Sequence, residues 1–237
     1  MPSFAVILPA AGQSSRFGGT EKKPFLQLDG TPIWQRSAEL FCHRPDVSKV
    51  CVVVSPDDRE QFESRFGAIC KSLAVEIVSG GAERFESVAN ALATIPETVD
   101  FVAVHDAVRP LLTQQGIHDV FAAAVQHGAA MLGTPVVDTI KRVESALNRI
   151  IETVPRAGLW AAQTPQVFRR DWLVEAYVWR HVVHEPITDD AQLIEAQGHP
   201  VIMVPSPPTN FKMTTQWDFE LAEMILQSRN AVPRITL

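Results

Sequence analysis

Short apolar segments alternate with amphipathic ones along most of the chain. The apolar segments are rich in Val and Ile and end at turn residues, which is typical of strands buried on both faces of a parallel sheet. We expect such strands at residues 4–8, 50–54, 75–78, 101–104 and 131–137.

Segments with helical spacing lie between these runs. Thr31 before Pro32 suits a helix N-cap followed by proline at the first helical position. Residues 83–95 and 113–126 carry apolar side chains three or four positions apart. Alternating strands and helices predict an α/β fold with a doubly wound, mostly parallel sheet flanked by helices. In such a sheet, ligands bind beyond the carboxyl ends of the strands.

The pattern changes between about residues 135 and 158. Two β-like runs, 136–143 and 150–154, are separated by a polar stretch that contains Asn148. We interpret them as a hairpin arm that leaves the main domain. Because an isolated hairpin is only marginally stable in water, the arm should pack on another surface. After the arm, Thr215 to Asp218 resembles a capping box before a helix at 221–226. We expect one domain over residues 1–237, arm included.

Composition narrows the class of partner. The 237 residues are 46% hydrophobic, which suits a globular core, and the formal net charge of −6 disfavours nucleic acid as a partner. The apolar run at 4–8 is too short for a signal peptide or a membrane span, so we expect no membrane and a cytoplasmic location. Cys42, Cys51 and Cys70 share no close spacing, which predicts reduced thiols and neither a zinc site nor a catalytic cysteine.

Small residues follow the first expected strand: Pro9, Ala10, Ala11 and Gly12. They let a ligand approach the backbone closely, and exposed amides there can bind phosphate oxygens. The glycine spacing of a P-loop or a dinucleotide fingerprint is absent. A tight strand-to-loop connection whose small residues bind no ligand is an equally good interpretation at this point.

Arg16 and Lys23 favour the functional alternative. Two cations seven residues apart on a glycine-flanked loop can reach a triphosphate from two directions, Arg as a fork and Lys as a point charge. Nucleotidyl transfer builds negative charge at the α-phosphorus, which fixed cations stabilise. We interpret the neighbouring Lys22 as part of a solvated run of charges.

Two further segments follow expected strands. Gly80 and Gly81 end one strand and open a helix, and Ser87 adds a hydroxyl; a plain capped helix start is the alternative. Asp106 follows another strand, where a carboxylate beside phosphates suits Mg²⁺. We expect the adjacent His105 to be structural.

Several residues farther along the chain would suit a second phosphate site. Taken singly, each has an ordinary surface explanation, and Thr188 is an ordinary N-cap. These residues are Thr139 with Lys141, Arg156 and Lys212.

Together these segments resemble the 2-C-methyl-D-erythritol 4-phosphate cytidylyltransferases. The resemblance covers nearly the whole chain, and its strength lies in seven motifs in the family's order. They are Pro9-Ala10-Ala11-Gly12 with Arg16 and Lys23, Gly80-Gly81-x-x-Arg84-x-x-Ser87-Val88, His105-Asp106-Ala107-Val108-Arg109-Pro110, Asp138-Thr139-Ile140-Lys141, Thr164-Pro165-Gln166, Ile187-Thr188-Asp189 and Asn210-Phe211-Lys212.

The resemblance implies a Rossmann-like nucleotidyltransferase fold, a homodimer formed through the arm, and cytidylyl transfer from CTP with Mg²⁺ in the non-mevalonate isoprenoid pathway. It implies that Arg16, Lys23 and Lys212 are catalytic. It assigns CTP binding to Pro9, Ala10, Ala11, Gly12, Gly81, Ala82, Ser87 and Asp106, with Asp106 also near the metal. It assigns the acceptor phosphate to Arg109, Thr139, Arg156 and Thr188.

This chain departs from the family's pattern at two places. The family usually has Pro-Lys-Gln around its loop lysine, whereas residues 22–25 read Lys-Lys-Pro-Phe, and Pro24 stiffens the following backbone. Ala82 stands where the family often has an acidic residue, so base recognition would rely on main-chain groups. Two alternatives remain: a ribitol-5-phosphate cytidylyltransferase, since methylenes separate acceptors by only about 1–3 kcal/mol, and a non-catalytic nucleotide-binding homologue.

Overall fold

The computed structural model describes residues 1–12, 22–180, 183 and 186–231. Within these residues, seven strands form one sheet in the order β11-β7-β10-β6-β1-β4-β5. Only β10 runs antiparallel to its neighbours β6 and β7, so the sheet is mostly parallel as expected. The strands are β1 (Phe4–Pro9), β4 (Val47–Val54), β5 (Val75–Ser79), β6 (Phe101–Val104), β7 (Ala129–Pro135), β10 (Trp160–Arg169) and β11 (Ile202–Pro205).

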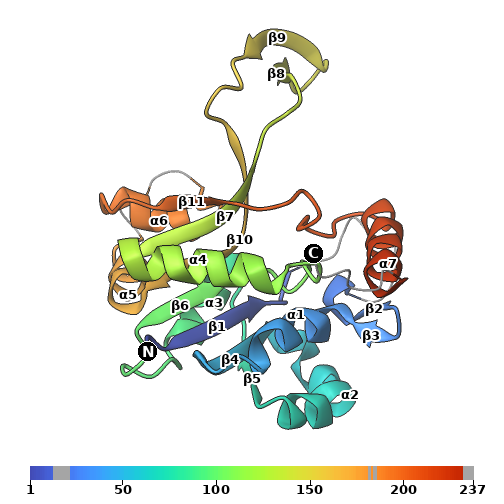
Figure 1. The fold of residues 1–237 in the computed structure, drawn as a ribbon, viewed down its shortest axis with the longest axis vertical. Coiled ribbons are helices and arrows are strands. Elements are labelled where there is room, and N and C mark those ends of the chain that lie inside the picture. The colour runs from blue at the N-terminus through green and yellow to red at the C-terminus, as the bar shows by residue number, and fades with distance from the viewer. Residues whose placement is uncertain (13–21, 181–182, 184–185, 232–237) are drawn as a thin grey trace.

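Helices cover both faces of this sheet. The helices are α1 (Ile33–Cys42), α2 (Arg59–Ser72), α3 (Arg84–Leu92), α4 (Gln114–His127), α5 (Arg170–Val178), α6 (Ala191–Ala196) and α7 (Gln216–Ala231). One core cluster packs α1, α2 and α4 on one face, and a second packs α3, α5 and α6 on the other. The described part of the chain is therefore a three-layer α/β/α body, with α7 lying at its side (Figure 1).

The expected arm is present and stands out from the body. Strands β8 (Ile140–Glu144) and β9 (Arg149–Val154) form a separate antiparallel pair at the tip of the projection (Figure 1). Asn148 lies in the turn with a φ of 51°, a left-handed conformation that asparagine tolerates. Many apolar side chains of the arm are solvent-exposed, among them Leu147, Ile150 and Ile151.

Several elements differ from the sequence-based expectation. Thr31 is not the N-cap of α1: it pairs in the short strand β3 (Thr31–Pro32) with β2 (Gln27–Leu28), and Pro32 is the cap. The hairpin's first strand begins at Ile140 instead of residue 136, and β7 ends at Pro135. The sequence analysis also did not predict β10, whose run contains Pro165 and polar residues that argue against a strand.

Other helix starts follow the pattern of the sequence. Thr113 caps α4, since its side chain accepts a hydrogen bond from the Gly116 amide at 3.1 Å. The capping box before α7 is confirmed: Asp218 accepts from the Thr215 amide at 2.7 Å, and the Asp218 amide donates to the Thr215 hydroxyl at 3.3 Å. None of the described helices is long and apolar enough to cross a bilayer.

Candidate functional site

A cavity of about 780 Å³ lies beyond the carboxyl ends of β1, β5 and β6. The chain leaves β1 for β4 and β5 on one side and returns to β6 on the other, so this is where the strand order reverses. Its described lining residues are Pro9, Ala10, Ala11, Gly12, Lys22, Lys23, Pro24, Ser55, Pro56, Asp57, Gly80, Gly81, Ala82, Glu83, Arg84, Ser87, Asp106, Val108, Lys212, Met213 and Thr214. Every residue expected to bind CTP is in this set, as are two of the three expected catalytic cations.

Small residues bring two loops together at one side of the cavity. A Cβ on Gly80 would lie 2.9 Å from the Ala11 Cβ and 2.8 Å from the Ser87 hydroxyl, closer than side chains pack. Glycine is therefore required where the β5 loop meets the β1 loop. This close approach exposes main-chain groups to the cavity on both loops.

The start of α3 is both a capped helix start and part of the cavity wall, the two alternatives that the sequence left open. Glu86 accepts hydrogen bonds from the amides of Ala82, at 2.8 Å, and Glu83, at 3.1 Å, so the helix start is well capped. Ser87, which is 2% exposed, accepts from the Gly81 amide at 3.1 Å and also lines the cavity. Because these amides are already used, the main-chain carbonyls are the groups left for a nucleobase.

The Asp106 carboxylate is the centre of charge in the cavity. It is 6% exposed and faces three cations: Lys212 Nζ at 3.2 Å, Arg109 Nε at 3.2 Å and Arg84 Nη2 at 3.8 Å. Burial would raise the pKa of Asp106, but Lys212, Arg84 and Arg109 together hold that pKa well below its usual range. Asp106 is therefore ionised throughout the working pH range and fixes the Lys212 ammonium beside the cavity.

Arg109 does not line the cavity. Its guanidinium is buried, donating to Asp106 and, at 2.8 Å, to the Asn210 carbonyl oxygen. Asn210 in turn donates to the carbonyl of Thr164 at 2.9 Å, which ties the segment before Lys212 to β10. The sequence placed Arg109 on the acceptor phosphate; in the single chain its described contacts position Asp106 and the loop that carries Lys212.

His105 is buried between two polar groups. Its Nδ1 lies 3.1 Å from the Thr164 hydroxyl, and its Nε2 lies 3.1 Å from the Arg109 carbonyl oxygen. The Arg109 carbonyl can only accept, so Nε2 carries the proton of the neutral ring and Nδ1 accepts from the Thr164 hydroxyl, which itself accepts from the Asp106 amide at 3.0 Å. These contacts support the structural role that the sequence analysis expected.

This burial predicts a stability change with pH. Burial lowers the pKa of His105 from 6.5 to about 4, with a smaller opposing effect of Asp106, so the folded state disfavours the imidazolium. The contribution is fully present above pH 6.5 and is lost as the pH falls towards 4, up to about 3 kcal/mol. Urea unfolding at pH 7 and pH 5 should show a smaller pH dependence for His105→Gln than for the wild type. Equal pH dependence in both proteins would contradict the neutral imidazole.

The two lysines at the edge of the cavity have different partners. Lys22 Nζ forms an ion pair with Asp58 and lies 3.2 Å from the Ser55 hydroxyl, so it is half-buried and not part of a solvated run of charges. Lys23 Nζ donates to the Thr214 carbonyl oxygen at 2.6 Å, two residues beyond Lys212. Pro24 belongs to a single 3₁₀ turn, η1 (Lys23–Phe25), that separates these lysines from β2. Arg16 lies outside the described residues.

The residues expected at the acceptor phosphate do not reach the cavity within one chain. Thr139 and Arg156 are exposed in the arm, and the Arg156 guanidinium donates to the Val137 carbonyl. Thr188 is exposed before α6, where its amide donates to Gln192 at 2.9 Å. The described part of this chain therefore brings the residues expected to bind CTP to one cavity, whereas the residues expected at the acceptor phosphate lie apart from it.

Arg84 is a charged cavity residue to which the sequence analysis gave no role. Arg84, the first residue of α3, lines the cavity and lies between Asp106 and Asp190. Arg84 belongs to the motif at residues 80–88 that contributes to the resemblance, and this motif was the one sign in the sequence that Arg84 has a function. Its partner Asp190 is 106 residues away in the chain, so no local pattern predicts the pair.

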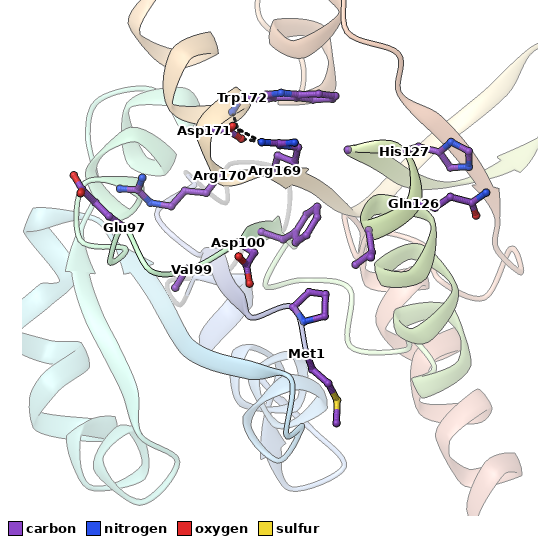
Figure 2. Close-up of a pocket in the computed structure, with 14 residues that line it drawn as sticks. Met1, Glu97, Val99, Asp100, Gln126, His127, Arg169, Arg170, Asp171 and Trp172 are labelled. Atoms are coloured by element: carbon purple, nitrogen blue, oxygen red, sulfur yellow. Dashed lines mark hydrogen bonds and ion pairs between the residues drawn. The ribbon is translucent and has the colours of Figure 1, made fainter.

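A larger cavity of about 870 Å³ lies at the opposite edge of the sheet, near the N-terminus. Figure 2 shows its charged groups close to one another: Arg169 pairs with Asp171 beneath the Trp172 ring. Asp100 is held by Ser3, and the Arg170 guanidinium lies 3.3 Å from the Ile95 carbonyl oxygen. Arg169 and Asp171 neutralise each other, and this cavity lies away from the carboxyl ends of the parallel strands, so we place the functional site in the smaller cavity.

The described residues contain no cluster of three or more His, Cys, Asp or Glu side chains that would hold a metal alone. Asp106 fits a different arrangement, in which a single carboxylate joins a Mg²⁺ that phosphate oxygens and water otherwise coordinate. Lys212 and Arg109 lie against its Oδ2, whereas Oδ1 has only Arg84 as a close charged neighbour among the described residues. Oδ1 is thus the atom suited to a metal.

The chain has extensive similarity to proteins of known family. The sequence profile of the 2-C-methyl-D-erythritol 4-phosphate cytidylyltransferases matches residues 4–228. An enzyme of that name from Rhodopirellula baltica is 40% identical over 94% of this chain and 95% of its own length. One from Symbiobacterium thermophilum is 42% identical over 94% and 92%.

Solved structures agree with the sequence comparisons. The crystal structure of 2-C-methyl-D-erythritol 4-phosphate cytidylyltransferase from Thermus thermophilus superimposes with a TM-score of 0.78 at 32% identity, covering 96% of this chain and 100% of that one. The expected α/β nucleotidyltransferase fold is therefore confirmed. This chain belongs to the 2-C-methyl-D-erythritol 4-phosphate cytidylyltransferase family.

Proposed function

We propose that this protein transfers the cytidylyl group of CTP to 2-C-methyl-D-erythritol 4-phosphate, giving 4-diphosphocytidyl-2-C-methyl-D-erythritol and pyrophosphate. The observation that carries the proposal is the Asp106–Lys212 pair, at 3.2 Å, beside the small-residue cradle of Ala11 and Gly80. The relatives are named for methylerythritol phosphate, which favours that acceptor over ribitol phosphate. The cavity also keeps its lysines, which disfavours a non-catalytic homologue.

The reaction needs no covalent enzyme intermediate. A phosphate monoester has a second pKa of roughly 6, so its oxygen is already a nucleophile near pH 7. That oxygen forms a bond to the α-phosphorus as the bond to the β-phosphate oxygen breaks, and pyrophosphate leaves with that electron pair. Lys23 and Lys212, together with Arg16 from the loop, stabilise the charge that develops around the α-phosphate.

Main-chain carbonyls support the choice of cytosine as the base. The amides of Gly81 and Ala82 are engaged by Ser87 and Glu86, which leaves carbonyl oxygens as acceptors in this part of the cavity. Cytosine offers an amino donor at C4, whereas uracil offers a carbonyl there. A site with mainly acceptors therefore favours CTP over UTP. The backbone of Ala82 offers the same main-chain groups as an acidic residue at this position would.

We include Mg²⁺ as the cofactor in this proposal. Asp106 Oδ1 would hold it, and the ion would supply charge neutralisation for the phosphates of CTP. The chain's own residues bind and orient the substrates: Lys212 stays fixed by Asp106, and the β1 and β5 loops hold the nucleoside.

We also include a homodimer formed through the arm. Exposed apolar side chains are concentrated there, among them Val137, Val143 and Ile150 at 73%, 43% and 59% exposure. An isolated two-stranded pair is marginal in water, so these side chains need a partner surface. Thr139 and Arg156 of the partner subunit would then supply the acceptor-phosphate site that the single chain lacks.

Pyrophosphate release tests the activity directly. The assay compares the four nucleoside triphosphates and the two acceptors, methylerythritol phosphate and ribitol phosphate, with Mg²⁺ present. We expect turnover with CTP and methylerythritol phosphate. Turnover with ribitol phosphate but none with methylerythritol phosphate would reject the proposed acceptor, and preference for another nucleotide would reject the proposed donor.

Mixing two impaired variants tests the shared site. Lys23→Ala removes a donor-side group and Arg156→Ala an acceptor-side group, so each homodimer is expected to be nearly inactive. In a mixed dimer, one of the two sites regains both native residues, so an equal mixture should recover about a quarter of wild-type activity. The activity of the mixture is measured after unfolding and refolding together. Recovery no greater than the mean of the two separate variants would place Arg156 in its own subunit's site.

A further inference from the structure

A line of buried polar groups lies behind the cavity, between α5, α6 and α3. The Tyr177 hydroxyl in α5 donates to Asp190 Oδ1 at 2.5 Å. Asp190 Oδ2, just before α6, accepts from Arg84 Nη2 at 2.9 Å. The same nitrogen of Arg84 lies 3.8 Å from Asp106 Oδ1. The line therefore ends at the carboxylate that holds Lys212.

The outer members of this line are fixed in place. Asp190 and Tyr177 are 1% and 4% exposed, and neither lines the cavity. The Asp190 amide donates to Gln166 Oε1 at 3.1 Å, which fixes the backbone of Asp190 against β10. Burial is the main cause that raises the pKa of Tyr177, and the nearby Asp190 carboxylate raises it further. The Tyr177 hydroxyl therefore keeps its proton and remains a donor. A carboxylate held this rigidly fixes the guanidinium with which it pairs.

Arg84 stands between two carboxylates at unequal distances. It makes a hydrogen-bonded ion pair with Asp190, but its 3.8 Å distance to Asp106 is too long for a hydrogen bond. Removal of the Asp190 charge would leave Asp106 as the nearest anion, and the attraction would close that gap. Arg84 would then occupy Oδ1, the Asp106 atom that Lys212 and Arg109 leave open.

We propose that Asp190 and Tyr177 are positioning residues that hold Arg84 away from Asp106, so that Asp106 Oδ1 stays open to the metal–nucleotide. This inference rests on the proposed function and adds to it a restraint on the donor site. Neither residue touches substrate; both act through Arg84. The restraint makes one non-intuitive prediction: removal of Arg84 should relieve the damage caused by loss of the Asp190 charge.

Direct binding of CTP tests this inference without turnover. Isothermal titration of the purified full-length protein with CTP and Mg²⁺ gives Kd, and thermal unfolding gives the stability of each variant. Asp190→Asn is expected to raise the Kd at least about tenfold, because it breaks a buried charge pair. The control is Asp189→Asn, which removes the same charge one residue earlier. Asparagine keeps one of the two oxygens that accept from Gln166 Nε2 and the Gln192 amide, and neither oxygen has a described contact with Arg84. The Kd of this control should stay within about twofold of the wild type.

The double variant Asp190→Asn/Arg84→Met separates restraint from general damage. With no guanidinium to move onto Asp106, it should bind CTP several-fold more tightly than Asp190→Asn alone, a coupling that only interacting residues show. Tyr177→Phe keeps the Asp190 charge but removes one of its hydrogen bonds, and it should raise the Kd about threefold. It serves as the test if Asp190→Asn does not fold.

The outcomes distinguish the inference from the function on which it rests. A wild type that binds no CTP overturns the proposed function and the restraint with it. A wild type that binds CTP, with Asp190→Asn and Asp189→Asn equal in Kd, overturns the restraint alone. So does a double variant that binds no tighter than Asp190→Asn, or, where that variant does not fold, a Tyr177→Phe protein with wild-type Kd.

Discussion

An Asp106→Asn variant is expected to lose about 10³-fold in kcat/KM and about 3–5 kcal/mol in the free energy of unfolding. Asparagine keeps the size of the side chain but removes the one anion that Arg84, Arg109 and Lys212 share. Lys212 would lose the partner that fixes its ammonium beside the cavity. Three cations would then repel one another around a neutral, 6% exposed side chain.

Asp100→Asn is the matched control for this prediction. Asp100 precedes β6 as Asp106 follows it, but it is exposed at the far edge of the sheet, and among the described residues its carboxylate accepts hydrogen bonds from Ser3 alone. Steady-state kinetics and urea unfolding of both variants give the comparison, and Asp100→Asn should retain activity within about twofold. Similar kinetic losses in the two variants would mean that Asp106 has no special place in the reaction.

The stability lost in Asp106→Asn should depend on pH with a defined sign. The three cations hold the folded-state pKa of Asp106 below its ordinary 3.8, so its stabilising contribution is present above about pH 3.8. It is lost as the pH falls from there towards the lower folded-state pKa. The difference in stability between wild type and variant should therefore shrink below about pH 3.8, whereas the effect of His105 lies between pH 6.5 and 4.

The convergence of the expected CTP-binding residues could be predicted from sequence because these residues follow the strands. The apolar runs that became β1, β5 and β6 were each placed within one residue of their observed ends. Parallel strands bring their carboxyl ends to one edge, so Gly12, Gly81 and Asp106 had to converge. Small residues and a carboxylate at those ends then indicated a phosphate and metal site.

The partners of these residues could not be predicted in the same way. Arg109 follows Asp106 by three residues, and nothing in that spacing tells that its guanidinium turns inward to Asp106 and the Asn210 carbonyl. The Arg84–Asp190 ion pair joins segments 106 residues apart in sequence. Such contacts depend on how helices pack on the sheet, which periodicity does not encode.

The residues expected at the acceptor phosphate could not be placed for a different reason. Thr139 and Arg156 were selected by resemblance, and the arm places both away from the cavity of their own chain. No hydrophobic pattern within one chain specifies which surface the arm covers. The assignment of these residues and the dimer therefore stay predictions until the mixed-variant experiment is done.

The two adjacent lysines give the second large prediction. Lys23→Ala is expected to lower kcat/KM at least about 10²-fold, since removal of one fixed charge donor at a reacting group costs roughly that much. Lys22→Ala should change kcat/KM by less than about fivefold, because the Lys22 ammonium is already paired with Asp58 and the Ser55 hydroxyl.

The reason for this difference lies in where each ammonium is anchored. Lys23 Nζ bonds to the Thr214 carbonyl, on the same loop that carries Lys212, so Lys23 and Lys212, two of the three cations expected to be catalytic, meet at one short segment. The 3₁₀ turn at Pro24 begins with Lys23 and follows Lys22, so the departure from the family's pattern leaves Lys23 beside that loop. Steady-state kinetics with CTP and methylerythritol phosphate give the kcat/KM of both variants for comparison with the wild type. If Lys22→Ala were the more damaging change, the catalytic lysine would be one residue earlier and the Thr214 contact would have no catalytic meaning.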